Sequence, residues 1–268
     1  MSGNDVEKSI LQTIDNLQRL KDINSILDNV LLEARKIANA DAGTIFLATK
    51  SGLTFNYVQT SSLSVKNDVV ASHYRYYTIP IDKSSIVGYC ASTGKQVTIR
   101  DAYNLPGDVP FSFNSFFDRK TGYRTKSVFA LPLLTLGNNL VGVMELINSR
   151  DEEGNPTDFS PEIKQYISRF ASYAAAAIER AKWNQELILR MIRMAELRDP
   201  GETAAHVQRV SAIAAEIYTQ WAKNKKIDPF EANHFRDLLR PAAMLHDVGK
   251  IGTVSYTHLR AHETVLDL

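Results

Sequence analysis

The sequence contains a single cysteine, Cys90, among 268 residues. One thiol cannot form a disulfide within the chain, and such sparse use of cysteine is typical of a reducing compartment. No apolar run approaches the roughly 18 residues that a membrane-spanning helix needs. The first residues have neither the basic start nor the apolar core of a signal peptide. These absences predict a cytoplasmic protein with no membrane segment.

An excess of charge of either sign is also missing. Lysine and arginine total 31 and aspartate and glutamate total 30, which gives a formal net charge of +1. A chain so balanced has no bulk electrostatic attraction to a nucleic-acid polymer. Hydrophobic residues make up 44% of the chain, with 13 glycines and 9 prolines, which excludes disordered and collagen-like classes. The length fits one large domain or two small ones.

Helical and strand-like patterns follow each other in the first 150 residues. Apolar residues recur in steps of three and four from Val6 to Ile37, which predicts either an amphipathic packing helix or a short coiled coil. Short runs rich in β-branched and aromatic residues then predict five strands. These strands are Gly43–Ala48, Leu53–Gln59, Gln96–Arg100, Ser127–Leu134 and Leu140–Ile147, the last two forming a hairpin. With a short helix over Ser85–Ser92 that Gly94 ends, they predict an α+β domain with an antiparallel sheet.

A long helix is predicted after the sheet. Ser160 is a suitable N-cap, Pro161 suits the first helical position, and Glu162 favours the positive end of the helix. No glycine or proline interrupts the sequence from Glu162 to Asp199, which corresponds to roughly 55 Å of helix. We interpret this segment as a connector between two domains and, together with the N-terminal helix, as a homodimer interface. Two shorter helices are the alternative.

The strongest candidates for chemistry lie on two further predicted helices. These helices cover Glu202–Lys223 and Pro229–His246. Glu202 and His206 are four residues apart, so both side chains project from one helix face. His246 and Asp247 follow an apolar stretch, and Lys250 comes three residues later. Imidazole and carboxylate groups are ligands for divalent first-row metals, and a lysine can hold a phosphate oxygen. Taken singly, each of these residues is more often an ordinary surface residue than a ligand.

The order of these residues resembles the HD-GYP family of metal-dependent phosphohydrolases. The series is Arg198-Asp199, Glu202, Thr203 and His206, then His246-Asp247-Val248-Gly249-Lys250. The resemblance implies hydrolysis of cyclic di-GMP at two or three divalent ions, iron or manganese. It assigns His206, His246 and Asp247 as metal ligands, with Asp247 bridging. By the same resemblance Glu202 ligates a third metal, and Lys250 contacts the scissile phosphate.

The chain also departs from that family. The later histidines, the later aspartate and the Gly-Tyr-Pro segment of the family are not found in this sequence. Residues 254–268 resemble a translated sequencing adapter, so we expect an artefactual tail there. Residues 199–253 are then a partial, all-α HD-GYP domain. We expect the parent protein to be an enzyme and this chain, with an incomplete metal cage, to be inactive by itself.

The earlier α+β segment resembles a GAF domain. The resemblance rests on Ala42–Leu47, Ile86–Gly94 and Leu140–Asn148, and we place the domain at residues 22–160. It follows an N-terminal helix at 1–21 and precedes the connecting helix at 161–198. The stretch 118–127 is similar to cyclic-nucleotide-binding GAF domains. That similarity implies a pocket lined by Asp118, Thr121, Thr125 and Glu145. A different small ligand, or a dimerisation domain without a pocket, are the alternatives.

These resemblances together predict a GAF-regulated cyclic-di-GMP phosphodiesterase that acts in signal transduction. We expect a cytoplasmic homodimer that responds to a small molecule and touches neither nucleic-acid polymers nor membranes. One alternative is a non-catalytic GAF module for ligand sensing and dimerisation. Another is a different HD-type nucleotide phosphohydrolase.

Overall fold

The structure is a computed structural model that describes residues 13–17, 20, 22–61, 78–196, 204–246 and 248–249. It divides into two compact units. The first unit contains residues 13–17, 26–61 and 78–179. The second unit contains residues 20, 22–25, 180–196, 204–246 and 248–249. The predicted tail at 254–268 and most of the predicted helix at 1–21 lie outside the described residues.

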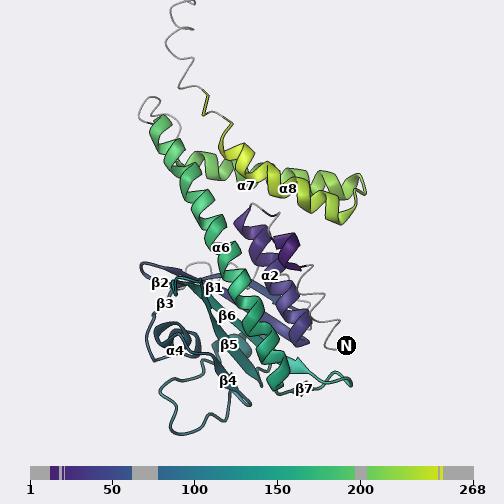
Figure 1. The fold of residues 1–268 in the computed structure, drawn as a ribbon. Coiled ribbons are helices and arrows are strands. Elements are labelled where there is room, and N and C mark those ends of the chain that lie inside the picture. Colours follow the sequence, from purple (N-terminus) through teal and green to yellow (C-terminus); the bar gives the residue numbers. More distant parts are fainter. Residues whose placement is uncertain are drawn as a thin grey trace, which may run out of the picture. The chain divides into compact units, whose positions relative to one another are not determined.

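An antiparallel sheet forms the centre of the first unit (Figure 1). Its described strands are β1 (Ala40–Thr49), β2 (Gly52–Thr60), β3 (Thr78–Ile79), β4 (Val97–Ile99), β5 (Val128–Leu134), β6 (Leu140–Arg150) and β7 (Pro156–Thr157). The order is β3-β2-β1-β6-β5-β4, with β7 paired to β6. The predicted α+β fold, its five strands and the β5–β6 hairpin are therefore confirmed, whereas β3 and β7 were too short to predict.

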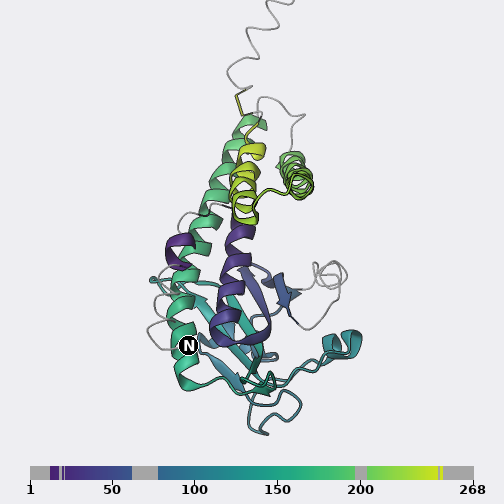
Figure 2. The same cartoon turned by 90° about the vertical axis from the view of Figure 1, so that its right-hand side faces the viewer.

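Helices cover both faces of this sheet. Figures 1 and 2 show α2 (Ile23–Ala38) and the first half of α6 (Pro161–Glu196) along one face. Leu31 of α2 lies so close to Gly43 of β1 that a Cβ atom there would be 2.8 Å from its Cδ1. On the other face, α4 (Ile86–Thr93) buries Val87 and Cys90 against the sheet. The sheet thus separates two layers of the core.

Helix boundaries follow the local signals in the sequence. The Ser85 hydroxyl accepts a hydrogen bond from the Gly88 amide at 3.1 Å, and Gly94 ends α4 with a left-handed φ of 65°. The Ser160 hydroxyl accepts from the Ile163 amide at 3.2 Å and so caps α6. Helix α6 then continues without interruption for 36 residues. A further short helix, α5 (Phe116–Thr121), was not predicted.

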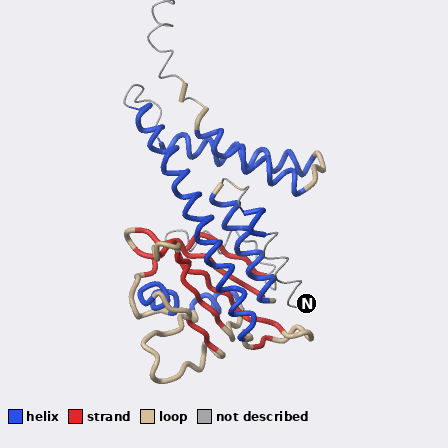
Figure 3. Tube along the Cα trace, viewed as in Figure 1, coloured by secondary structure: helices blue, strands red, loops and turns tan. Residues whose placement is uncertain are grey.

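The described part of the second unit is helical (Figure 3). It contains the second half of α6 with α7 (Ala204–Asn224) and α8 (Pro229–Met244). Ile192, Val207 and Met244 form a small buried cluster. The Ser211 hydroxyl donates to the Arg240 carbonyl oxygen at 2.8 Å and ties α7 to α8. Within the described residues no helix is both long and apolar enough to cross a bilayer.

Candidate functional site

A cavity of about 550 Å³ opens on the α4 side of the sheet in the first unit. Its lining comes from β1, β2, β3, β5 and β6 of the sheet, from the start of α4 and from the segment 112–125. Most of the lining is apolar, from Phe46, Val58, Ile79, Ile86, Val87, Phe113, Phe116, Phe117, Val128 and Ile147. Polar groups interrupt this surface at a few points, as is usual for a small-molecule site.

Glu145 brings a carboxyl group into this cavity from β6. It pairs with Thr44 on β1 and with Ala130 on β5 in the strand register. Among the described residues, no hydrogen bond or ion pair to its carboxyl group is found. Desolvation raises the pKa of Glu145 to about 7, because the ionised form loses water without gaining a cation. Near neutral pH this carboxyl can therefore accept or donate a hydrogen bond.

Asp118 and Thr125 also line the cavity, and they bind each other. Asp118 is 4% exposed. Its Oδ1 accepts from the Thr125 hydroxyl at 2.9 Å, and its Oδ2 accepts from the Thr125 amide at 2.7 Å and the Tyr103 hydroxyl at 2.9 Å. Three internal donors thus occupy this carboxylate. Asp118 consequently fixes the pocket wall in place.

Thr121 is the one predicted pocket residue that does not line the cavity. Its hydroxyl donates to the Phe117 carbonyl oxygen at 2.9 Å and accepts from the Tyr123 amide at 3.3 Å. These bonds hold the turn after α5, where Gly122 adopts a left-handed φ of 72°. The structure therefore brings Asp118, Thr125 and Glu145 together at the cavity, and Thr121 is not part of its lining.

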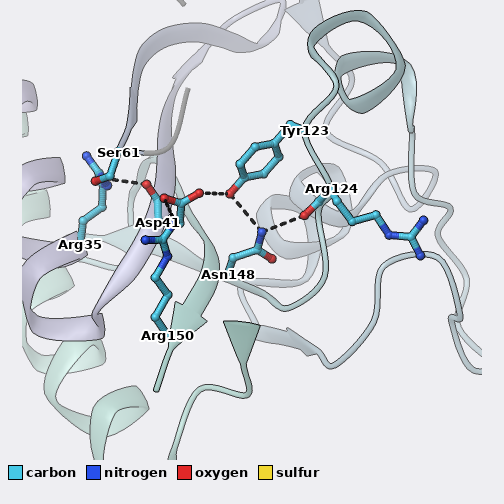
Figure 4. A network of polar contacts seen from close by, with 7 residues as sticks. All are labelled: Arg35, Asp41, Ser61, Tyr123, Arg124, Asn148 and Arg150. Carbon is cyan, nitrogen blue, oxygen red and sulfur yellow. Dashed lines mark hydrogen bonds and ion pairs between the residues drawn. The ribbon is translucent and has the colours of Figure 1, made fainter. Parts of the chain in front are cut away.

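Sequence reasoning missed Tyr123, although it lies inside the stretch that was singled out. Tyr123 lines the cavity, and its hydroxyl donates to Asp41 Oδ2 at 2.8 Å (Figure 4). Arg150 pairs with the other oxygen of Asp41 at 2.6 Å, and Asn148 donates to the Tyr123 hydroxyl at 3.0 Å. Burial is the largest cause that raises the pKa of the Tyr123 hydroxyl, followed by its bond to Asp41. Tyr123 and Asp41 are 82 positions apart, so no local signal could have paired them.

The cavity lining also contains groups that attract anions. Ser85, Ile86 and Val87 at the N-terminus of α4 line the cavity, and Arg119 does so from α5. A helix N-terminus carries partial positive charge and amide donors, and a guanidinium adds a full charge. Beside an apolar surface and the Glu145 carboxyl, this combination suits a ligand with a flat, hydrogen-bonding ring and an anionic group.

Cys90 belongs to the buried core beside α4 and does not line the cavity. It is fully buried on α4, and desolvation followed by the nearby Glu145 raises the pKa of its thiol to about 12. A neutral, buried thiol is a poor nucleophile. Cys90 therefore serves as apolar packing.

In the second unit the structure brings two of the predicted metal ligands near each other. The ring centroids of His206 on α7 and His246 after α8 are 6.3 Å apart. His246 Nδ1 lies 2.9 Å from the Ala243 carbonyl oxygen, the contact that fixes the tautomer of many metal-binding histidines. Glu202, Asp247 and Lys250 lie outside the described residues. Within the described part of the chain, no group of three potential ligands converges.

Comparison with known proteins identifies relatives of the first unit. The model of the GAF domain matches residues 22–178. A probable 3′,5′-cyclic phosphodiesterase of Caenorhabditis elegans is 28% identical over 180 residues, which cover 66% of this chain and 22% of the relative. A cGMP-specific 3′,5′-cyclic phosphodiesterase of Drosophila melanogaster is 24% identical over 178 residues, 64% of this chain and 15% of the relative. The chain thus spans between about a seventh and a fifth of the length of these relatives.

A solved structure supports the same fold. It is the GAF domain of a phosphoenolpyruvate-protein phosphotransferase from Coxiella burnetii, with a TM-score of 0.55 and 14% identity. The match covers 69% of this chain and 99% of that one. At this identity the likeness concerns the fold alone.

Proposed function

Because the chain belongs to the GAF domain family, we propose that its first unit is the sensor of a signal-transduction protein and binds a cyclic nucleotide. The observation that carries this proposal is the Glu145 carboxyl, which lies in an apolar cavity without a described partner. A purine supplies both a flat apolar surface and edge donors for that carboxyl. The α4 N-terminus and Arg119 would take the cyclic phosphate. Two relatives with phosphodiesterase names support this choice of ligand.

Cyclic GMP is the preferred ligand in this account. Guanine offers two adjacent N–H donors that an ionised carboxylate can accept together, whereas adenine offers one donor beside an acceptor. Calorimetric titration of the full chain should show saturable 1:1 binding of cyclic GMP and weaker binding of cyclic AMP. Arg119→Gln should weaken both by about three- to tenfold, because one exposed phosphate contact is lost. A folded chain that binds neither nucleotide contradicts the proposal.

A second function, for the longer protein, is the hydrolysis of cyclic di-GMP by an HD-GYP domain. The approach of His206 to His246 favours it, because the resemblance names both as ligands. His206 and His246 would hold the metal with Asp247, and Glu202 would add a third-metal ligand. Bound divalent ions supply a hydroxide nucleophile and neutralise phosphate charge, and Lys250 would bind the phosphate. Other HD-type nucleotide hydrolysis remains the alternative.

Metal binding tests this second proposal without relying on turnover. Equilibrium dialysis of the full chain against Mn²⁺ should show bound metal that His206→Ala and His246→Ala each remove. Arg209→Ala, also on α7, serves as the control and should retain the metal. The chain by itself should not hydrolyse cyclic di-GMP, because the further ligands of the family are not in its sequence. Unchanged Mn²⁺ binding in both histidine variants contradicts the assignment.

We also propose a cytoplasmic homodimer with α6 in the interface. Trp183, Leu187 and Met194 on this helix are 60%, 54% and 68% exposed in the single chain. Their spacing of four and seven places them along one side of the helix, where a second copy could bury them. Sedimentation equilibrium should give a dimer that Leu187→Glu dissociates, and a monomeric wild-type chain contradicts this arrangement.

A further inference from the structure

Polar contacts lead from the cavity wall to helix α2 in the first unit (Figure 4). Tyr123 lines the cavity and donates to the carboxylate of Asp41, which is 3% exposed. The backbone oxygen of Asp41 accepts from the Arg35 guanidinium at 2.7 Å. Arg35 lies on α2 and also donates to the hydroxyl of Ser61 and to Gln59. Asp41 thus binds Tyr123 through its side chain and Arg35 of α2 through its backbone oxygen. Displacement of the Tyr123 hydroxyl therefore changes the surroundings of the residue to which α2 is bound.

The other end of α2 is attached to α8 in the second unit. The Asp22 carboxylate accepts from the Ser25 amide at 3.1 Å and so caps the first turn of α2. The backbone amide of the same residue donates to Asp237 Oδ1 at 2.7 Å. Asp237 lies on α8 and is fully buried, and Arg240, one turn later, lies 3.9 Å from the Asp22 carboxylate. Asp22 thus serves as the cap of α2 and as its anchor on α8.

We propose that α2 transmits the state of the cavity to α8, through Tyr123, Asp41 and Arg35 at one end and Asp22 and Asp237 at the other. Each set of contacts lies within one unit, and the helix itself is the covalent link between them. A helix of 16 residues moves largely as one body because its backbone bonds are internal. This inference rests on the proposed function and deepens it, because it names how ligand binding in the cavity would affect the second unit.

The two carboxylates on this route, Asp41 and Asp237, are buried, so each depends on its hydrogen-bond donors. A buried carboxylate that loses one of its donors is strongly disfavoured, so Asp41 must readjust when Tyr123 moves. The Asp237 carboxylate on α8 must likewise readjust if it loses a donor, and one of its donors is the backbone amide of Asp22. At the end of α8, the Ala243 carbonyl oxygen contacts the ring of His246. A shift of α8 therefore repositions one of the proposed metal ligands.

Amide hydrogen exchange of the full chain, without any ligand, tests the coupling. Tyr123→Phe removes the hydroxyl that donates to Asp41 and accepts from Asn148, and it keeps the aromatic ring. It should raise the exchange rate at Ser25 and at residues 236–240 of α8 by at least about threefold, because the opening of a coupled element is shared. Tyr103→Phe is the control, since it removes a tyrosine hydroxyl bond to another buried carboxylate, that of Asp118, whose hydrogen bonds within the described residues do not include a residue of α2. It should leave both regions within about 1.5-fold of the wild type.

The far end of the route supplies the second test. Asp237→Asn weakens the acceptor for the Asp22 amide and should also raise exchange at Ser25. Asp22→Asn keeps a capping side chain and the backbone amide but removes the charge that faces Arg240, so any rise in exchange should lie mainly at residues 236–240. The double variant Tyr123→Phe with Asp237→Asn should show less than the summed effect. The proposal is overturned if Tyr123→Phe alters only residues 41 and 118–125. Such a result would leave cyclic-nucleotide binding untouched, because no ligand enters the experiment.

Discussion

Replacement of Asp118 by alanine is expected to destabilise the first unit by about 2–4 kcal/mol. The substitution leaves the Thr125 amide, the Thr125 hydroxyl and the Tyr103 hydroxyl without their acceptor. Two of these donors belong to a residue that is 4% exposed, so water cannot easily replace the carboxylate. Asp118→Asn should cost less, since it keeps one acceptor oxygen. Urea unfolding followed by circular dichroism measures both.

A nearby aspartate provides the control for this prediction. Asp101 lies in the same connecting region and accepts one exposed backbone hydrogen bond, from the Tyr103 amide at 3.0 Å. Asp101→Ala should therefore change the free energy of unfolding by less than about 1 kcal/mol. Equal losses for the two alanine variants contradict the view that the Asp118 carboxylate holds the pocket wall.

Glu145→Gln is expected to stabilise the chain at pH 8 by roughly 2–3 kcal/mol. In the folded protein burial raises the pKa of Glu145 to about 7, from 4.5 for a glutamate in water. A raised acid pKa means that the folded state holds the proton more tightly. Stability therefore falls as the pH rises from about 4.5 through 7, and the neutral glutamine escapes this loss.

The gain should disappear in acid. At pH 4 the carboxyl is protonated in the folded state and largely so in the unfolded state, so Glu145→Gln and the wild type should have similar unfolding free energies. Glu153→Gln, which makes the same charge change at an exposed position, controls for net charge. A Glu145→Gln variant that is less stable than the wild type at pH 8 shows that an unseen partner stabilises the ionised form.

The sequence was informative wherever a feature depends on neighbours in the chain. Ser85 and Gly94 bound α4 because a cap hydroxyl and a left-handed glycine act within one turn. The five principal strands follow from alternation and turn residues, which are also local. Helix α5 was missed because its six residues carry no periodic apolar pattern.

The candidate site was only partly predictable for the same reason. Glu145 could be placed on β6 from the sequence. That its carboxyl group has no hydrogen bond or ion pair among the described residues could not be predicted, because this depends on how distant segments pack around it. The role of Asp118 depends on Tyr103 and Thr125, and that of Tyr123, in the loop between α5 and β5, depends on Asp41 of β1. Such long-range contacts arise from packing, which no short motif encodes.

Titration of the full chain with cyclic GMP at pH 6 and pH 8 tests most directly whether the Glu145 carboxylate binds a nucleotide in this cavity. Binding through the ionised carboxylate requires the group to lose its proton, and with a pKa of about 7 the affinity should rise about tenfold between these two pH values. Glu145→Gln should bind more weakly at pH 8 and show no such rise. Saturable binding whose affinity is the same at both pH values, or no binding at either, contradicts the account.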